Sequence, residues 1–171
     1  MDAAPLAPDF LQTNAWTIDV ANSIAAVVAL RPDYELLLRQ TQNTLPFSLH
    51  EWHVTWCAHF LNHSPGIVDQ PMFYRIRDAS GACVAIFPLI MSRRRVGPLR
   101  IYSVTSLGAD PAITEIRTPL IAPGHERMAV EKVRNHLYAT QEWDWIQWTG
   151  VTADMFAESE HFGSLKWQTP L

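Results

Sequence analysis

Hydrophobic positions recur along this chain with two different periods, and the changes of period predict its elements. Spacings of three and four residues indicate helices, whereas alternation or short continuous apolar runs indicate strands. The helices predicted in this way span 32–42, 48–62 and 125–140. The strands predicted span 16–20, 73–77, 83–92, 99–105, 118–121 and 143–148, and 23–30 fits either element. This order predicts an α/β (α+β) fold with a mixed, largely antiparallel sheet flanked by helices.

The start of the second predicted helix carries the clearest local signal. Ser48 and Glu51 have the S-x-x-E spacing of a capping box, in which each side chain bonds an unpaired backbone N–H. Phe47 and Trp52 flank the box at the positions of a hydrophobic staple. The sequence therefore predicts that the helix begins at Ser48. On this basis Ser48→Ala should remove roughly 0.5–2 kcal/mol of stability.

Two turns and a proline shape the predicted meander. Asp78 and Gly81 bound a hairpin turn in which Gly81 can adopt a positive φ, and Gly97 with Pro98 forms a second turn. Pro88 interrupts the strand between these turns and lacks the N–H that a central strand would donate. We therefore expect Pro88 to lie on an edge strand or at a bulge.

Length and composition favour one globular domain. The chain has 171 residues, of which 48% are hydrophobic and seven are Trp, so it has enough apolar surface for a core. We expect a loose leader over 1–15 and a single domain over 16–171. The formal net charge of −4 creates no positive field, so nucleic acid is not an expected partner.

The cysteines and the N-terminal residues bear on the compartment. Cys57 and Cys83 match neither a zinc spacing nor a C-x-x-C pair, and we expect buried free thiols in a reducing compartment rather than a disulfide. Residues 1–10 contain no Lys or Arg, unlike a signal peptide. The apolar stretch 24–30 is far shorter than the roughly 20 residues of a membrane span. A soluble, cytoplasmic protein without membrane insertion is expected.

Histidines crowd the predicted helix 48–62. His53 shares a helical face with Cys57, and such a pair could supply two metal ligands. His59 and His63 point away from that face, and no second pair with ligand spacing occurs in the sequence. We therefore expect no metal site and a histidine packed in or near the core.

The densest basic run leads into the second turn. Arg94 and Arg95, followed by Gly97, partly match the Q/R-x-x-G-x-G/A loop with which GNAT acyltransferases hold the pyrophosphate of acetyl-CoA. Pro98 has no N–H to donate, Leu99 replaces a small residue, and a strand rather than a helix follows. We expect a solvated hairpin tip and no cofactor site in this chain, with Arg94 and Gly97 as the residues to consider. Contact between the run and an anionic acceptor or partner stays open.

Catalytic residues are not identified by the sequence. No G-x-S-x-G elbow and no recognisable Cys-His signature occurs. Asp110, Glu115 and Asp144 fall near predicted strand ends, where sites often form, although a lone carboxylate there is more often a turn or cap residue. Asp110 and Glu115, together with Arg95, are the candidates for substrate binding.

Tryptophans suggest two alternatives. Trp143, Trp145 and Trp148 in the last strand, with Trp52 and Trp56 in a helix, could form a platform on which sugars stack. Buried Trp at such positions more commonly belongs to the core, and we favour the core.

The order of several short motifs resembles the CelD-like acetyltransferases, a family associated with cellulose and exopolysaccharide biosynthesis. These motifs are 30–34 with Leu37, 46–48 with Trp52 and Trp56, 76–81, V-A-I-x-P-L at 84–89, 107–108, 119–121 and 143–146. The resemblance, which extends to Fem-type transferases with two GNAT-like halves, implies a GNAT-like fold. In such enzymes the C-terminal half binds acyl-CoA and the N-terminal half shapes the acceptor groove.

The resemblance implies that this chain is the N-terminal, acceptor-side half, a truncated domain that is inactive alone. The whole enzyme would transfer an acyl group from acetyl-CoA or another acyl-CoA to a sugar-containing or cell-envelope acceptor. Its expected partner is a C-terminal GNAT half or a second copy of itself, bound through an apolar patch on 143–148 and around Pro88. The alternative is a non-catalytic binding or scaffold module with the same fold.

Overall fold

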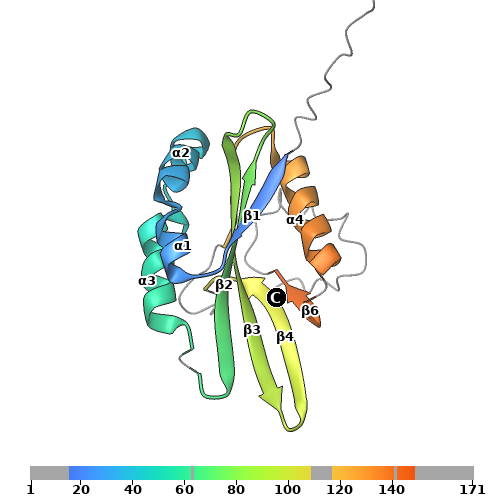
Figure 1. Ribbon diagram of the computed structural model, residues 1–171. Coiled ribbons are helices and arrows are strands. Elements are labelled where there is room, and N and C mark those ends of the chain that lie inside the picture. Colours follow the sequence, from blue (N-terminus) through green and yellow to red (C-terminus); the bar gives the residue numbers. More distant parts are fainter. Residues whose placement is uncertain (1–15, 63, 109–116, 141, 149–171) are drawn as a thin grey trace, which may run out of the picture.

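A six-stranded mixed sheet forms the centre of the molecule (Figure 1). The computed structural model describes residues 16–62, 64–108, 117–140 and 142–148. The strands are β1 (Thr17–Ala21), β2 (Ile67–Arg77), β3 (Cys83–Val96), β4 (Leu99–Ser106), β5 (Leu120–Ile121) and β6 (Trp145–Gln147). Their order is β1-β2-β3-β4-β6, with β5 paired to β3. All pairs are antiparallel except β4 and β6, which are parallel.

Helices cover both faces of this sheet, as predicted. The helices are α1 (Ile24–Val28), α2 (Arg31–Thr41), α3 (His50–Phe60) and α4 (Glu126–Thr140), and a 3-10 turn spans Pro46–Ser48. The first three lie on one face and α4 lies on the other (Figure 1). Because α4 connects the parallel strands β4 and β6, it serves as their crossover. The predicted α/β class with a largely antiparallel sheet is confirmed.

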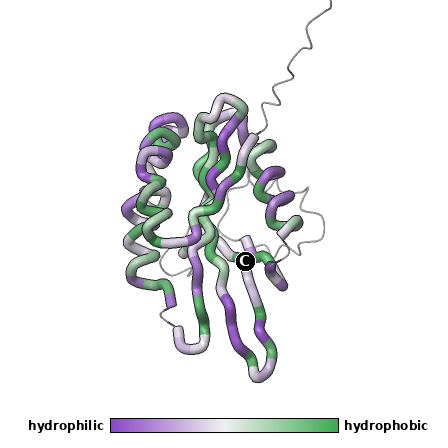
Figure 2. The backbone as a smooth tube through the Cα atoms, in the orientation of Figure 1, coloured by the Kyte–Doolittle hydropathy of each residue, from purple (hydrophilic) through white to green (hydrophobic). Residues whose placement is uncertain are grey.

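The central hairpins are longer than the sequence pattern predicted. β2 begins at Ile67 instead of 73, and β3 continues to Val96 instead of ending at 92. The added residues project past the helices (Figure 1), and polar residues among them, such as Asp69, Gln70 and Arg93, break the apolar pattern that marks a covered strand. Figure 2 shows the same change along β3, whose first half is hydrophobic and whose second half is hydrophilic.

Pro88 lies in a central strand, so the prediction of an edge position or a bulge is wrong. β3 pairs with β2 along its length, with β5 at Ala85 and Ile86, and with β4 from Leu89 onward. The Pro88 carbonyl accepts a hydrogen bond from the Leu107 N–H at 2.9 Å, so the nitrogen of Pro88 faces the place where β5 gives way to β4. The bond that Pro88 cannot form is the reciprocal one to Leu107, just beyond the end of β4. Pro88 is buried, which also contradicts the expected bare apolar patch around it.

The predicted capping box does not form. Ser48 belongs to the 3-10 turn, and the N-cap of α3 is Leu49, which makes no side-chain capping bond. The Ser48 hydroxyl instead accepts a hydrogen bond from Asn43 Nδ2 at 3.1 Å, so a competing local bond moves the helix start. The Phe47 and Trp52 rings do contact each other edge-on, with centroids 5.3 Å apart.

Buried histidines join α3 to the core, as predicted for this helix. His53 Nδ1 is hydrogen-bonded to the Tyr34 hydroxyl at 2.8 Å, and its ring packs on Phe73 with centroids 5.7 Å apart. His50 Nε2 bonds the Val27 carbonyl at 2.9 Å. Burial, with a smaller contribution from His50, lowers the pKa of His53 to about 3. His53 is therefore a neutral core residue at physiological pH.

An ion-pair network joins β1, α2 and β2 on the same face. Arg75 Nε lies 3.0 Å from Asp19 Oδ1, and Arg75 Nη1 lies 2.9 Å from Asp33 Oδ2. Arg77 Nη2 also reaches Asp33 Oδ2, at 3.4 Å. Because all four side chains are partly buried or at the boundary, the network fixes the helix against the sheet more firmly than a fully exposed pair would.

The two cysteines are buried free thiols, as predicted. Burial raises the pKa of both Cys57 and Cys83 to about 12, so both remain protonated at neutral pH. Neither is a nucleophile in this state.

Among the described residues, no helix has both the length and the apolar character needed to cross a bilayer.

The lowered pKa of His53 predicts acid sensitivity of the fold. An unfolded histidine binds a proton below about pH 6.5, whereas folded His53 binds one only near pH 3. Stability should therefore fall as the pH drops from about 6.5 toward 3, by up to about 1.4 kcal/mol per pH unit. His53→Gln should flatten this dependence, measured as the free energy of unfolding in urea at several pH values.

The matched control is His59→Gln, which removes an exposed histidine from the same helix. Equal pH dependence in the two variants would show that His53 does not carry the effect.

Candidate binding groove on the open sheet face

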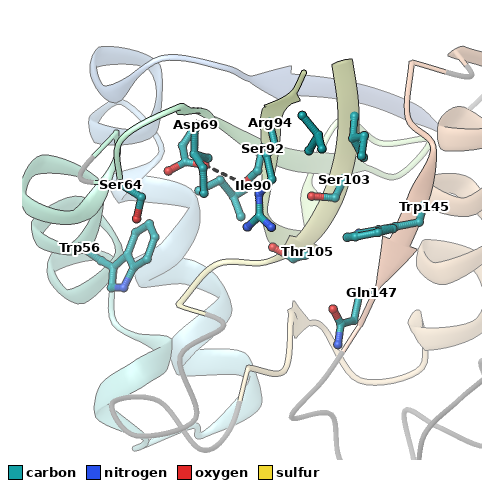
Figure 3. Close-up of a pocket in the computed structure, with 13 residues that line it drawn as sticks. Trp56, Ser64, Asp69, Ile90, Ser92, Arg94, Ser103, Thr105, Trp145 and Gln147 are labelled. Atoms are coloured by element: carbon teal, nitrogen blue, oxygen red, sulfur yellow. Dashed lines mark hydrogen bonds between the residues drawn. The ribbon is translucent and has the colours of Figure 1, made fainter. Parts of the chain in front are cut away.

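The sheet face that carries α1–α3 is not covered by these helices where β2 and β4 begin and β3 ends. A groove of about 540 Å³ lies there, within the usual size range of small-molecule sites. It is lined by Trp56 and Ser64 beside α3, and by Ile67, Asp69, Ile90, Ser92, Arg94, Val96, Ile101, Ser103, Thr105, Trp145 and Gln147 from four strands. Figure 3 shows the labelled side chains converging on this space.

Strand register arranges the floor of the groove in rows. The middle row crosses the sheet through Asp69, Ser92, Ser103 and Trp145, which pair in that order. The row toward the helices contains Ile90, Thr105 and Gln147, and the row toward the hairpin tip contains Ile67, Arg94 and Ile101. The floor therefore presents hydroxyl and amide groups between two tryptophans.

Asp69 holds the middle row in place. Its Oδ1 accepts a hydrogen bond from the Ser92 hydroxyl at 2.6 Å, and its Oδ2 accepts one from the Asn62 N–H at 3.3 Å. Asn62 Oδ1 in turn accepts from the Asp69 N–H at 2.7 Å. These bonds attach the residues after α3 to β2 and β3, and they fix the carboxylate at the side of the groove.

Trp145 forms one wall and is 52% exposed, so the predicted core position is wrong for this residue. The core interpretation holds for Trp148, which is buried and packs edge-on against Phe87. Trp56 stands at the other wall, stacked on Phe60 with centroids 5.6 Å apart. An exposed indole face beside hydroxyl groups offers both apolar contact and hydrogen bonding to a ligand.

Asp144 positions Trp145 and has a structural role. Its Oδ2 accepts a hydrogen bond from the Tyr102 N–H at 2.7 Å, and its own N–H donates to the Tyr102 carbonyl at 2.8 Å. The backbone bond extends the pairing of β4 and β6 by one residue, and the side-chain bond caps the Tyr102 N–H beside it. The prediction that a carboxylate at this strand end acts as a local cap is confirmed for Asp144.

Arg94 is the sequence candidate that the structure brings into the groove, where its guanidinium extends across the floor (Figure 3). Arg95 lies on the opposite face, because side chains alternate along a strand, and its Nε donates to the Gly97 carbonyl at 3.2 Å. Gly97 has φ +60° in the two-residue tip between Val96 and Leu99. The predicted hairpin tip is therefore correct. Asp110 and Glu115 lie outside the described residues.

Metal binding finds no support in the described ranges, where no three His, Cys, Asp or Glu side chains gather as ligands. His53 and Cys57, which share a helical face, both point into the core.

Sequence reasoning missed most of the groove. The groove residues that the sequence did not single out are each common surface residues within their own segments. They are Asp69, Ser92, Ser103, Thr105 and Gln147. The available signal was the polar residue at every second position in two strands that are adjacent in sequence. Only the register aligns those positions with each other and with β6.

Trp145 and Trp148 should differ sharply in their effect on stability. Trp145→Ala should change the free energy of unfolding by no more than about 0.5 kcal/mol, as surface substitutions usually do. Trp148→Ala should cost about 3–5 kcal/mol, because it empties a buried site. Urea denaturation of both variants measures the difference. A similar large loss in both would place Trp145 in the core and leave the groove without a wall.

Comparisons with known proteins leave the family open. No family model matches this sequence, and no curated protein matches it. One solved structure similar to this chain is the ribosomal-protein-alanine N-acetyltransferase from Brucella melitensis biovar Abortus 2308, at 12% sequence identity and a TM-score of 0.48. The alignment covers 92% of this chain and 98% of that one. A similarity at this level assigns neither family nor activity.

Proposed function

We propose that this chain is the acceptor-binding part of a GNAT-type acyltransferase, and that the groove binds a sugar-containing acceptor. The observation that carries the proposal is the polar middle of the groove floor beside an exposed tryptophan. The resemblance of the sequence motifs to acyltransferases of exopolysaccharide biosynthesis is consistent with it.

The composition of the floor favours a polar ligand over a covering helix. A sheet face that packs against a helix is rich in Val, Ile and Leu, as β3 is between Cys83 and Ile90. From that point toward the hairpin tip, the hydroxyls of Ser92, Ser103 and Thr105 stand among apolar lining residues, and a covering helix would bury these polar groups at a cost. A sugar supplies hydroxyl groups to bond them and an apolar ring face to stack on Trp145.

In this proposal the groove binds the acceptor and does not activate it for the transfer reaction. Among its described lining residues the carboxylate is Asp69, which accepts hydrogen bonds from Ser92 and Asn62, and we assign these bonds to holding the groove in place rather than to activating the Ser92 hydroxyl. Acyl-CoA binding is therefore assigned to a further unit, either a C-terminal GNAT half or a second copy of the chain.

Saccharide binding tests the proposal directly. Calorimetric titration with a panel of oligosaccharides should reveal at least one that binds, and Trp145→Ala should weaken that binding by about tenfold or more, since it removes the stacking surface. Met128→Ala is the control, because Met128 is an exposed apolar residue on α4, across the sheet. A panel without any binder, or equal losses in the two variants, would refute the proposed role of the groove.

Acetyl-CoA should not bind this chain with useful affinity. At the basic hairpin tip Pro98 lacks the backbone N–H that an acyl-CoA loop needs, Leu99 replaces a small residue, and β4 rather than a helix follows. Calorimetric titration with acetyl-CoA should give no saturable heat. Micromolar binding that Arg94→Ala abolishes would overturn the division of roles proposed above.

A further inference from the structure

We infer that the acceptor is an acidic saccharide, whose carboxylate or phosphate group is bound by Arg94 while its neighbouring hydroxyls occupy the middle row of the groove. This inference rests on the proposed saccharide site and adds the charge of the ligand. It follows from the surroundings of Arg94, from the fixed position of Asp69 and from the charge of the hairpin.

Arg94 has no anionic partner within the described part of the chain. The ion pairs found there involve Arg31, Arg75, Arg77 and Arg134, whereas no carboxylate lies within 4.0 Å of Arg94. Its cross-strand neighbours on the groove floor are Ile67 and Ile101. Its guanidinium is exposed at the groove without an ion-pair partner, and its planar donor fork matches a carboxylate or phosphate.

Asp69 lies in the adjacent row but forms no ion pair with Arg94, since no contact within 4.0 Å joins the two side chains. Its carboxylate oxygens already accept hydrogen bonds from the Ser92 hydroxyl and the Asn62 N–H, which hold it at the side of the groove. The rows of Arg94 and Asp69 are two residues apart, about 7 Å along the strands. The acidic group of a saccharide can therefore contact Arg94 while its uncharged hydroxyls lie beside Asp69, Ser103 and Trp145.

The hairpin that carries Arg94 adds a positive field. Arg93, Arg95 and Arg100 lie on the other face of the same two strands, and Arg95 stands directly opposite Arg100. Both side chains are exposed, so solvent screens the repulsion within this pair. In a chain with a net charge of −4, the tip is a local positive region that attracts anionic ligands toward the groove.

The test compares three ligands that share one backbone. They are a neutral β-1,4-linked glucose tetrasaccharide, its counterpart with a carboxylate at each C6, and its 6-phosphorylated counterpart. Calorimetric titration at low salt should give at least about tenfold tighter binding to an acidic form than to the neutral one, as expected for a charge-assisted bond. The carboxylated and phosphorylated forms distinguish the two sources of the acidic group.

Arg94→Gln should abolish the preference for the acidic form, so that the ratio of the acidic to the neutral affinity falls by about tenfold or more. The matched control is Arg93→Gln, which removes the same charge from the adjacent residue on the opposite face and should keep the preference. Circular dichroism confirms that both variants are folded, as expected for exposed side chains.

Each remaining outcome overturns the inference. Equal affinity for neutral and acidic forms removes it and leaves the saccharide site intact. Binding of inorganic phosphate as strong as that of the phosphorylated saccharide would show an anion site without sugar recognition. The absence of binding by all three ligands, when another oligosaccharide binds in the panel, removes the acidic acceptor alone. If no saccharide binds at all, the proposed function fails as well.

Discussion

The pairing of β3 with a neighbour on each side is the constraint on which the rest of the structure depends. β3 is in register with β2 from Cys83 to Arg94 and with β4 from Leu89 to Val96. Its first half is apolar on both faces and anchors the core between the two helical layers. Its second half is polar, and the same register turns it into the middle of a groove. One strand therefore sets both the stability and the candidate site.

Asp69 links these two halves. Through Asn62 it holds the segment that follows α3, and through Ser92 it holds the point at which β3 changes from apolar to polar. Trp56 is part of α3, so the position of that groove wall follows from the packing of α3 through His53, Tyr34 and Phe73. The geometry of the groove thus depends on a core that lies outside it.

Local patterns in the sequence predicted most of the elements but little of the groove. The buried faces of α2 and α4 follow from spacing alone, and the hairpin turns follow from Gly81 and Gly97. The face of α3 does not, because His50 and His53 are buried while Leu49 and Phe60 are exposed. The capping box at Ser48 failed because Asn43, five residues earlier, competes for the hydroxyl. The position of Pro88 was predicted wrongly, because a central strand can tolerate proline at the point where its partner changes from β5 to β4. Only the strand topology shows where that point lies.

The groove could not be predicted because its rows join residues that are up to 76 positions apart, from Asp69 to Trp145. A polar residue on an exposed strand and a polar residue in a binding site look alike in one sequence. What separates them is whether several converge on one enclosed space beside an aromatic wall. A helix that covered that floor would bury the hydroxyls of Ser103 and Thr105 at a cost, whereas the Ser92 hydroxyl already donates to Asp69. The same polar groups that keep this face open therefore select a ligand that can hydrogen-bond to them.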